Sequence, residues 1–435
     1  MKRFIYNCLF NVGFFAAAPF YLFKMARRGD WRRGFGQRFG HYETRLKHAL
    51  TNRDVVWLHA VSVGEANLVV GLIAALEKRL PIHKFVVSTT TSTGMAVLTQ
   101  RLPDRVSKIY YPIDRRKHIQ RAMGTIHPEA VVLVEAELWP NFLWSLQRRR
   151  VPYFLVNARI SERSFRGYRR FQFLFRELFA GFTGVTAQNE SDAARLRSLG
   201  VRADAIQVVG SLKFDAAKLG TPKRLDVPAL LAQLGMPRDR LVLVAGSTHA
   251  GEEAILARVF RRLQERFPGL VLILVPRHHE RGREVGDELS RQGVRYRFRT
   301  ELTAGVRIEP GSVECLLVNT TGELLSFYES ADLVFVGKSL TAQGGQNPIE
   351  PAALGKAMVF GPHMENFPHV VPQFLEAGGA RQVADERSLE RVLGELLMDP
   401  ARRTEMGRKA LEVVRQNAGA MEATVELIAT RVKMS

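Results

Sequence analysis

The chain has 435 residues, of which 46% are hydrophobic, which is enough for two or three packed domains and excludes a largely disordered protein. Its two cysteines, Cys8 and Cys315, exclude a disulfide framework and a four-cysteine zinc site. Lysine and arginine number 63 against 43 acidic residues, so the formal net charge is +20. This balance predicts an anionic partner, which leaves acidic lipid, phosphorylated substrates and nucleic acid open.

The N-terminal segment is uncharged from Phe4 to Phe23, and a cluster of arginines follows it. About 20 apolar residues can span a bilayer, and positive flanks stay on the cytoplasmic side. We therefore predict that residues 1–26 are a membrane anchor, with the catalytic domains on the cytoplasmic face of the inner (plasma) membrane and the basic flank against anionic lipid. A helix lying on the membrane surface and a cleaved signal peptide are the alternatives.

In the first half, apolar runs alternate with helical patterns. The predicted strands are Val55–Ala60, Lys84–Thr89, Ser107–Tyr111, Ala130–Glu135, Tyr153–Asn157, Gly184–Ala187 and Gln207–Gly210. Helices are predicted between them at Glu65–Arg79, Gly94–Arg101, Arg116–Met123, Phe142–Arg149 and Ser191–Leu199. Continuous apolar strands separated by helices indicate a parallel sheet with both faces covered.

The pattern restarts in the second half. Strands are predicted at Leu241–Ala245, Val271–Val275, Cys315–Val318, Leu333–Val336 and Ala357–Phe360. Helices are predicted at Glu252–Phe267, Arg281–Arg291, Glu323–Ser330 and Ile349–Leu354, and two more, Arg402–Gln416 and Met421–Val432, near the end. The fold class is therefore α/β, with two Rossmann-like domains that bind ligands at the carboxyl ends of their strands across a central cleft.

The domain organisation follows from these patterns and from three prolines, Pro222, Pro228 and Pro237, in a stretch of mixed charge. We predict the anchor at 1–26, a first Rossmann-like domain at 27–215 and a linker at 216–240. A second Rossmann-like domain follows at 241–400, and helices at 401–435 pack across both domains.

The first candidate catalytic residue is Glu65, where a buried strand turns into a helix. Ser62 and Glu65 have the spacing of a capping box, in which both side chains bind backbone N–H groups. The same position, at the carboxyl end of a strand, suits a general base that takes a proton from an acceptor hydroxyl. The spacing leaves both interpretations open.

Two further candidates lie in the first half. Glu135 and Glu137 follow an apolar strand, and a period of two would place them on one face if the strand continued. The alternative is one surface carboxylate and one carboxylate at a helix start. Lys213, in Gly210-Ser-Leu-Lys-Phe-Asp215, is either a solvated lysine or a cation that stabilises negative charge in the cleft.

In the second half, several strand-to-helix turns carry glycine, arginine or glutamate. Gly246–Gly251 opens a helix and offers backbone N–H groups to an anion. Arg277 follows the next strand and can bind a phosphate through two N–H groups. Glu350 is either part of a cap, with Asn347 as N-cap and Pro348 at the first helical position, or an acceptor for a ribose hydroxyl. Together these turns predict a nucleotide site.

Several classes of protein are disfavoured by absent motifs. No phosphate-binding loop with a Walker lysine and no Gly-x-Gly-x-x-Gly opens the first half, which weakens ATPase and dehydrogenase interpretations. No Asp-x-Asp pair and no histidine ligand spacing is present, so no metal and no cofactor is predicted.

At this point the sequence resembles the 3-deoxy-D-manno-octulosonic acid (Kdo) transferases, from the N-terminal segment to the last helices. The segments that carry the resemblance are His59-Ala-Val-Ser-Val-Gly-Glu65, Glu137-Leu-Trp-Pro-Asn141, Asn157-Ala-Arg-Ile-Ser-Glu-Arg-Ser164, Ser211-Leu-Lys-Phe-Asp215, Gly246-Ser-Thr-His249, Pro276-Arg-His278, Gly322-Glu-Leu324 and Asn347-Pro-Ile-Glu-Pro-Ala352.

The resemblance implies a GT-B glycosyltransferase of lipopolysaccharide core biosynthesis. It implies a CMP-Kdo donor, a phosphorylated lipid A precursor as acceptor, and inverting, metal-independent transfer at the cytoplasmic face of the inner membrane. It also implies Glu65 as the catalytic base, with Glu135 and Lys213 supporting the transition state. The residues implied to contact CMP are Pro276, Arg277, Thr321, Gly322, Glu323, Asn347, Pro348, Ile349 and Glu350.

Some positions depart from the family pattern, and all of them lie in the second half. Thr321 stands where methionine is usual, and Lys338 replaces the second glycine of a strand-end pair. Gln343 and Gln346 replace an arginine and a histidine, and His279 replaces a proline. These departures leave open whether the donor is a modified Kdo.

A basic, aromatic stretch in the first half resembles an amphipathic helix at a membrane interface. It interleaves Phe165, Tyr168, Phe171 and Phe175 with Arg163, Arg166, Arg169, Arg170 and Arg176. The alternative is a cationic face over a stripe of core residues.

Two rival functions also stay open. One is another GT-B enzyme such as a nucleotide-sugar epimerase, which needs no anchor. The other is a nucleic-acid-binding protein, whose binding to duplexes would depend strongly on salt. We predict no nucleic acid partner.

Overall fold

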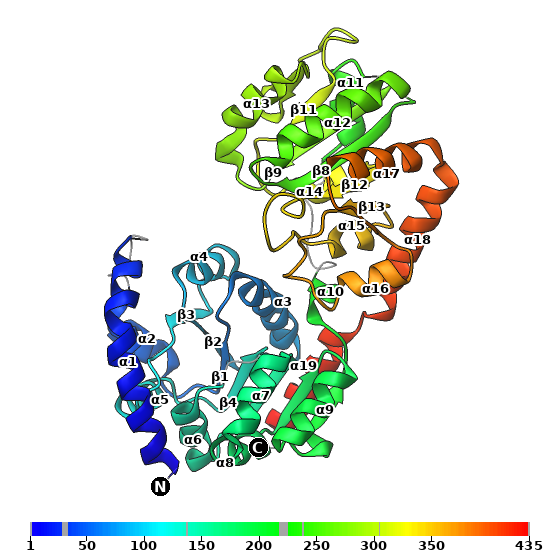
Figure 1. Ribbon diagram of the computed structural model, residues 1–435. Helices are drawn as coiled ribbons and strands as arrows, with labels where there is room; N and C mark the ends of the chain where they lie inside the picture. The colour runs from blue at the N-terminus through cyan, green and yellow to red at the C-terminus, as the bar shows by residue number, and fades with distance from the viewer. Residues whose placement is uncertain are drawn as a thin grey trace. The chain divides into compact units, whose positions relative to one another are not determined.

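The computed structural model describes residues 2–27, 34–135, 138–216, 225–236, 239–303 and 305–433. The chain divides into two compact units, Met1–Ala216 with Asn417–Ser435, and Ala217–Gln416. Each unit is a parallel sheet with helices on both faces, as the alternation of apolar strands and helices predicts (Figure 1). Helix α11 (Val227–Gln233) forms inside the segment predicted as a linker.

The first unit contains a seven-stranded sheet in the order β3-β2-β1-β4-β5-β6-β7, with all pairs parallel. The order reverses between β1 and β4, and ligands of such sheets bind where it reverses. The strands are β1 (Val55–His59), β2 (Lys84–Thr89), β3 (Ser107–Tyr110), β4 (Ala130–Val134), β5 (Tyr153–Ala158), β6 (Gly184–Ala187) and β7 (Ile206–Val208).

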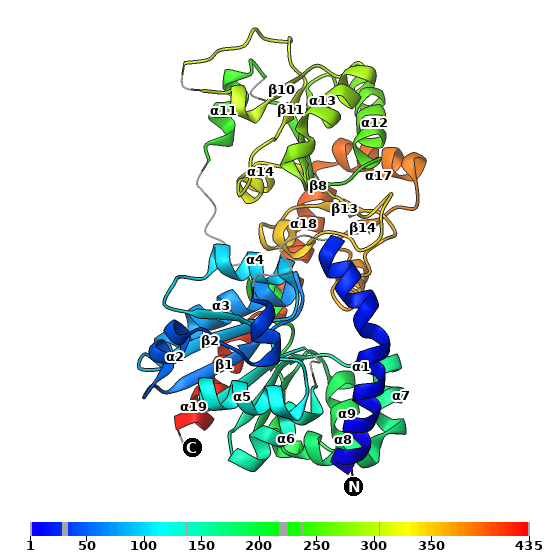
Figure 2. The same cartoon turned by 90° about the vertical axis from the view of Figure 1, so that its left-hand side faces the viewer.

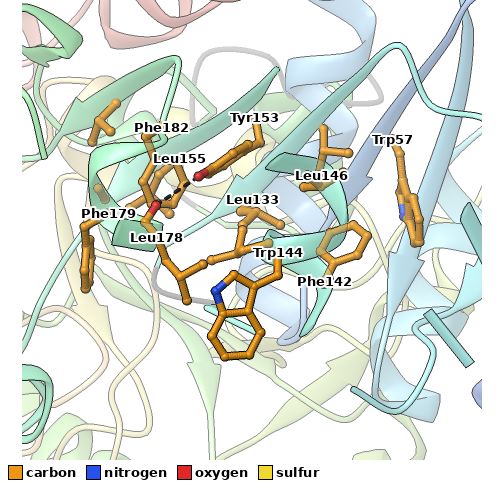
Figure 3. Packing of buried hydrophobic residues seen from close by; sticks show 14 of the residues in the cluster. Trp57, Leu133, Phe142, Trp144, Leu146, Tyr153, Leu155, Leu178, Phe179 and Phe182 are labelled. Atoms are coloured by element: carbon orange, nitrogen blue, oxygen red, sulfur yellow. Dashed lines mark hydrogen bonds between the residues drawn. The ribbon is translucent and has the colours of Figure 1, made fainter. Parts of the chain in front are cut away.

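Helices cover both faces of this sheet. They are α2 (Thr44–Leu50), α3 (Val63–Arg79), α4 (Ser92–Arg101), α5 (Arg116–Ile126), α6 (Pro140–Arg149), α7 (Glu162–Arg170), α8 (Gln172–Ala180), α9 (Glu190–Leu199), α10 (Leu212–Ala216) and α19 (Ala420–Lys433), with short 3-10 turns at Phe35–Phe39 and Ala203–Ala205. Aromatic rings fill one face of the core: Trp57 meets Phe142 edge-on at 4.9 Å between ring centroids. The buried hydroxyl of Tyr153 donates to the carbonyl of Leu178 at 3.0 Å (Figure 3).

The last helix, α19, returns to the first unit, where it packs on α3 and β6. Its N-terminus is capped by Asp215 at the end of α10, because that carboxylate accepts the N–H groups of Gly419 (3.0 Å) and Met421 (2.7 Å). Helix α18 (Pro400–Gln416) belongs to the second unit.

The second unit contains a seven-stranded sheet in the order β10-β11-β9-β8-β12-β13-β14. The order reverses between β8 and β12. The strands are β8 (Leu241–Thr248), β9 (Leu270–Pro276), β10 (Tyr296–Phe298), β11 (Cys315–Leu317), β12 (Leu333–Val336), β13 (Met358–Phe360) and β14 (Arg381–Gln382). The helices are α11, α12 (Glu252–Arg266), α13 (Gly282–Arg291), α14 (Leu324–Glu329), α15 (Ile349–Ala353), α16 (Val371–Glu376), α17 (Glu386–Met398) and α18, with 3-10 turns at His279–Arg281 and Arg299–Glu301.

Every predicted strand is present, and the elements that the sequence did not indicate include β10, β14 and α17. Strands β10 and β14 lie at the two edges of the second sheet and have only three and two residues. Strands this short carry no alternation long enough to recognise.

The N-terminal segment forms α1 (Lys2–Arg27), a helix of 26 residues. No helix among the described residues combines the length and the apolar character that crossing a bilayer demands, so the expected membrane-spanning anchor is not supported. Polar residues within the run explain the difference, because Tyr6 and Asn7 make hydrogen bonds to the first unit: the Tyr6 hydroxyl donates to Asp114 at 2.8 Å, and Asn7 pairs with Asn141. The helix lies beside α8 (Figure 2).

The opposite part of α1 faces away from the unit and is apolar. Phe4, Leu9, Val12 and Phe15 are 74%, 63%, 72% and 62% exposed. We call these four residues the α1 stripe. Leu9, Val12 and Phe15 follow one another at three-residue intervals, which keeps them on one broad side of the helix.

The basic, aromatic stretch is two helices, α7 and α8, that meet at Phe171. Phe165, Tyr168 and Phe175 pack against the core of the first unit. The five arginines are exposed. A cationic face over core residues therefore describes most of the stretch, although Phe171 and Phe173 remain exposed.

Candidate active-site residues of the two units

Glu65 lies in the first turn of α3, directly after β1, and its side chain is buried. The predicted capping box is confirmed: the Glu65 N–H donates to Ser62 Oγ at 3.2 Å, and Glu65 Oε1 accepts from the Ser62 N–H at 3.4 Å. The structure adds a stronger contact, from the Val61 N–H to Glu65 Oε2 at 2.8 Å. Two backbone donors therefore hold the carboxylate in one orientation.

Glu135 follows β4, which ends at Val134, one residue before the predicted end of the strand. The reason is the backbone of Glu135, which turns into the left-handed region with φ of 62°. Its N–H still donates to the Val156 carbonyl at 2.9 Å, so the position is pinned to β5. A non-glycine residue held in this conformation is uncommon, and such residues cluster at functional sites. Glu137 lies outside the described residues.

The charges around Glu135 show which groups are close to it. Burial raises the pKa of Glu135 above its usual value. The positive charge of Lys213 lowers that pKa, the carboxylate of Glu65 raises it, and Arg159 lowers it. The structure thus brings together the three first-half residues implied as catalytic, Glu65, Glu135 and Lys213, from β1, β4 and the chain after β7.

Asn157 is a residue of this cluster that the sequence did not single out for a role. It is fully buried on β5, next to Glu135 across the β4–β5 pair, and its φ is 53°. Its Oδ1 accepts the N–H of Leu212 at 3.0 Å, which ties the start of α10, and so Lys213, to the strand end. Its Nδ2 has no hydrogen-bond partner among the residues that the structure describes. One signal in the sequence could have indicated this residue: it is an asparagine at the end of an apolar strand, and asparagine tolerates the left-handed conformation.

In the second unit, the predicted nucleotide residues follow four strands that are neighbours in the sheet, β11, β9, β8 and β12. Parallel strands place their carboxyl ends at one edge, so this order gathers turns that are more than 100 residues apart in the chain. Pro276 ends β9 and is buried, and the Arg277 N–H donates to the Thr248 carbonyl of β8 at 3.0 Å. The Arg277 side chain is exposed.

Thr321, Gly322 and Glu323 follow β11, and the first two are exposed. The carboxylate of Glu323 is already engaged, since it accepts the Thr320 hydroxyl at 2.5 Å and lies 3.2 Å from the Arg299 guanidinium. Arg299 was not predicted as part of this turn, and nothing in the sequence between the two residues signals the pair.

Asn347, Pro348, Ile349 and Glu350 follow β12. The helix there begins at Ile349, as its predicted range has it, and one residue after the start that the cap interpretation implies. Pro348 is the N-cap and Ile349 the first helical residue of α15. The Asn347 side chain still caps the turn, because its Oδ1 accepts the Ile349 N–H at 3.1 Å and its Nδ2 donates to Glu350 at 3.1 Å. The cap interpretation therefore holds for the side chain of Asn347, with the helix boundary shifted.

A buried carboxylate, Glu252, joins two of these turns. It is fully buried at the start of α12 and accepts four backbone N–H groups at 2.7–2.9 Å, those of His249, Lys338, Ser339 and Leu340. The turn after β8 and the turn after β12 are therefore fixed to each other. Among the described residues, no group of three histidine, cysteine or carboxylate side chains is placed to hold a metal ion.

Comparisons with known proteins point to one family. Residues 33–216 match the model of the 3-deoxy-D-manno-octulosonic-acid transferase (kdotransferase) domain. The chain is 33% identical over 421 residues to the 3-deoxy-D-manno-octulosonic acid transferase of Bordetella pertussis, covering 94% of each chain. It is 30% identical over 399 residues to the enzyme of the same name from Haemophilus influenzae, covering 92% of this chain and 91% of that one.

Solved structures share the fold. A UDP-GlcNAc 2-epimerase from Neisseria meningitidis covers 86% of this chain and 99% of its own, with a TM-score of 0.57 at 14% identity. A glycosyltransferase from Rickettsia africae covers 88% and 99%, with a TM-score of 0.55 at 13% identity. At these identities the likeness shows a GT-B-like pair of α/β domains and carries nothing about substrates.

Proposed function

Because the chain belongs to the 3-deoxy-D-manno-octulosonic acid (Kdo) transferase family, we propose that it transfers Kdo from CMP-Kdo to a phosphorylated lipid A precursor. The transfer inverts the anomeric centre and uses no metal ion. Identity over nearly the whole length of two transferases of this name is the observation that carries the proposal. The reaction makes the protein a glycosyltransferase of lipopolysaccharide biosynthesis.

In this proposal a glucosamine hydroxyl of the acceptor attacks the anomeric carbon of Kdo, Glu65 takes the hydroxyl proton, and CMP leaves. The geometry of Glu65 supports the role. A carboxylate has about four acceptor sites, and backbone donors occupy two of them on Glu65. The same donors hold the group still, so little reorganisation is needed when the proton moves.

Glu135 and Lys213 support the transition state. Lys213 supplies positive charge beside Glu135, and the backbone of Glu135 is fixed at the end of β4. On the donor side, Arg277 and the turn after β8 bind the departing phosphate, with Pro276, Thr321, Gly322, Glu323 and the Asn347–Glu350 turn around the nucleotide.

The acceptor is lipid-borne, and we place the enzyme at the cytoplasmic face of the inner membrane as a peripheral protein. The α1 stripe offers exposed apolar side chains, and α8, which α1 contacts, carries the exposed Arg176 and follows the arginine-rich helix α7. Apolar side chains beside arginines are typical of surfaces that lie against anionic bilayers.

The central test is release of CMP from CMP-Kdo with and without a tetra-acylated lipid A precursor. We expect release that depends on the acceptor, together with a Kdo-bearing lipid product. Release without acceptor and without lipid product would favour a nucleotide-sugar enzyme such as an epimerase. No release, with salt-dependent binding to duplexes, would favour the nucleic-acid rival.

The membrane surface is tested by sedimentation with vesicles that contain phosphatidylglycerol. The double variant Phe4→Ser, Val12→Ser should bind these vesicles less than the wild type does. Ile82→Ser is the matched control, because Ile82 is 73% exposed in the same unit but lies between α3 and β2. Equal loss in both variants would contradict a specific role of the α1 stripe.

A further inference from the structure

Lys338 is the residue of the second unit whose conformation the proposed function leaves unexplained. It follows Gly337 after β12, at a φ of 54°, in the left-handed region that glycine adopts freely. Hydrogen bonds hold this backbone on both sides: the Lys338 N–H donates to Glu252 at 2.7 Å, and its carbonyl accepts the Gly345 N–H at 2.9 Å. A long cationic side chain is thus presented from a fixed, unfavourable backbone.

The ammonium group of Lys338 folds back over the same turn. Its Nζ lies 3.4 Å from the point where a Cβ on Gly344 would stand, so the ammonium group is next to Gly344. The charge also reaches the turn after β8: burial lowers the pKa of His249, and the positive charge of Lys338 lowers it further. The charge of Lys338, in the turn after β12, therefore acts on the turn after β8 as well.

No described carboxylate pairs with Lys338 or with Arg277. Other carboxylates at this edge have partners of their own: Glu253 lies 3.0 Å from Arg281, and Glu323 lies 3.2 Å from Arg299. Arg277 and Lys338 are thus left as two cations in the turns after β9 and β12, the strands that flank β8. Strands two positions apart are separated by about 10 Å, a gap that long arginine and lysine side chains close onto one ligand.

The donor of the proposed reaction carries two anions. One is the phosphodiester of CMP, and the other is the carboxylate of the sugar acid, which is attached to the anomeric carbon next to that phosphodiester. We infer that Lys338 binds the sugar carboxylate of the donor, while Arg277 binds the phosphodiester. This inference rests on the proposed function and adds a specificity residue to it, because a nucleotide sugar without the carboxylate gains nothing from Lys338.

The experiment compares a ligand that has the carboxylate with one that lacks it. Steady-state kcat/KM is measured for CMP-Kdo, and the inhibition constant is measured for CMP alone. Lys338→Gly should lower kcat/KM for CMP-Kdo by about tenfold or more, because a charge-assisted contact is lost. It should leave CMP inhibition within about twofold and should not lower the melting temperature, since glycine fits this φ.

Three further variants make the result decisive. Lys338→Asn removes the charge but tolerates the left-handed conformation, so it should reproduce Lys338→Gly even if the glycine variant folds poorly. Lys338→Arg keeps the charge and should recover most of kcat/KM. Arg277→Ala should weaken CMP and CMP-Kdo alike.

Unchanged kcat/KM in folded Lys338→Gly and Lys338→Asn, or equal loss of CMP affinity, would overturn the inference while leaving the transferase intact. A wild-type protein that neither releases CMP from CMP-Kdo nor is inhibited by CMP would overturn the proposed function, and the inference with it.

Discussion

The carboxyl edges of the two sheets both carry buried glutamates, but the two units use them in opposite ways. In the first unit, the buried carboxylate of Glu65 and the half-buried carboxylate of Glu135 lie near each other, and Lys213 adds positive charge beside Glu135. In the second unit, Glu252 is saturated by four backbone N–H groups, and Glu253 is held by Arg281. The difference suits one edge to taking a proton and the other to holding anions.

The two edges nevertheless share a backbone feature. Each has non-glycine residues in the left-handed conformation at neighbouring strand ends: Glu135 and Asn157 on β4 and β5, and Ser247 and Lys338 on β8 and β12. Strained positions persist only where surrounding contacts hold them. We therefore propose that the strained positions mark both edges as sites, and that the pairing of the carboxylates distinguishes the role of one edge from that of the other.

The largest effect is expected for Glu65→Gln, which keeps the shape of the side chain but cannot take the proton. Turnover at saturating CMP-Kdo should fall by about 10²–10⁴-fold. The control is Ser62→Ala, which removes the other half of the capping box and leaves the carboxylate. It should lower stability by about 0.5–2 kcal/mol with turnover near wild type. A folded Glu65→Gln enzyme with normal turnover would remove the base from the mechanism.

Glu252→Gln tests the opposite edge, where we expect a structural loss. The amide end of glutamine would face backbone donors, so two N–H groups lose their acceptor at about 1–3 kcal/mol each. The unfolding free energy should fall by that sum, and turnover per folded molecule should fall much less than in Glu65→Gln. Glu280→Gln, at an exposed carboxylate of the same unit, should change neither. A Glu252→Gln variant as stable as the wild type would contradict a structural role for the Glu252 carboxylate, and with it the difference between the two edges.

Arg277→Ala should weaken CMP binding, measured by calorimetry, by about 1.5–3 kcal/mol, because a charge-assisted contact to phosphate is lost. Arg283→Ala is the matched control, since Arg283 is exposed on α13 of the same unit. Equal CMP affinity in the wild type and Arg277→Ala would show that the cationic edge does not hold the phosphate.

The smallest effect concerns the stability of Glu135→Gln. Burial raises the pKa of Glu135 above 4.5, so the native state binds the proton more tightly than the unfolded state does. Ionised Glu135 therefore destabilises the fold as pH rises from 4.5 through the native pKa, and the penalty is absent below 4.5.

Glu135→Gln should therefore melt at a modestly higher temperature than the wild type at neutral pH, and the gain should vanish in acid. Turnover should fall in the same variant. A variant that melts lower at neutral pH would show that the pair with Lys213 outweighs burial.

The sequence by itself was sufficient for most of the elements, with exceptions such as β10, β14 and α17, and for the Ser62–Glu65 cap. Strand positions followed from continuous apolar runs, and the Ser62–Glu65 box followed from a spacing of three, because these signals involve residues that are close along the chain. The resemblance identified the family on eight short segments, most of which lie at strand ends.

Only the tertiary structure decided which charges are paired. The pairing of Glu323 with Arg299, three of the four donors on Glu252 and the tie between Asn157 and α10 join positions 24 to 88 residues apart. The tertiary structure also decided where the N-terminal helix packs. Its uncharged run predicts a bilayer span, but Tyr6 and Asn7 make hydrogen bonds to Asp114 and Asn141, which are more than 100 residues away in the chain. Side chains bind partners that the fold brings near, and no local pattern records those distances.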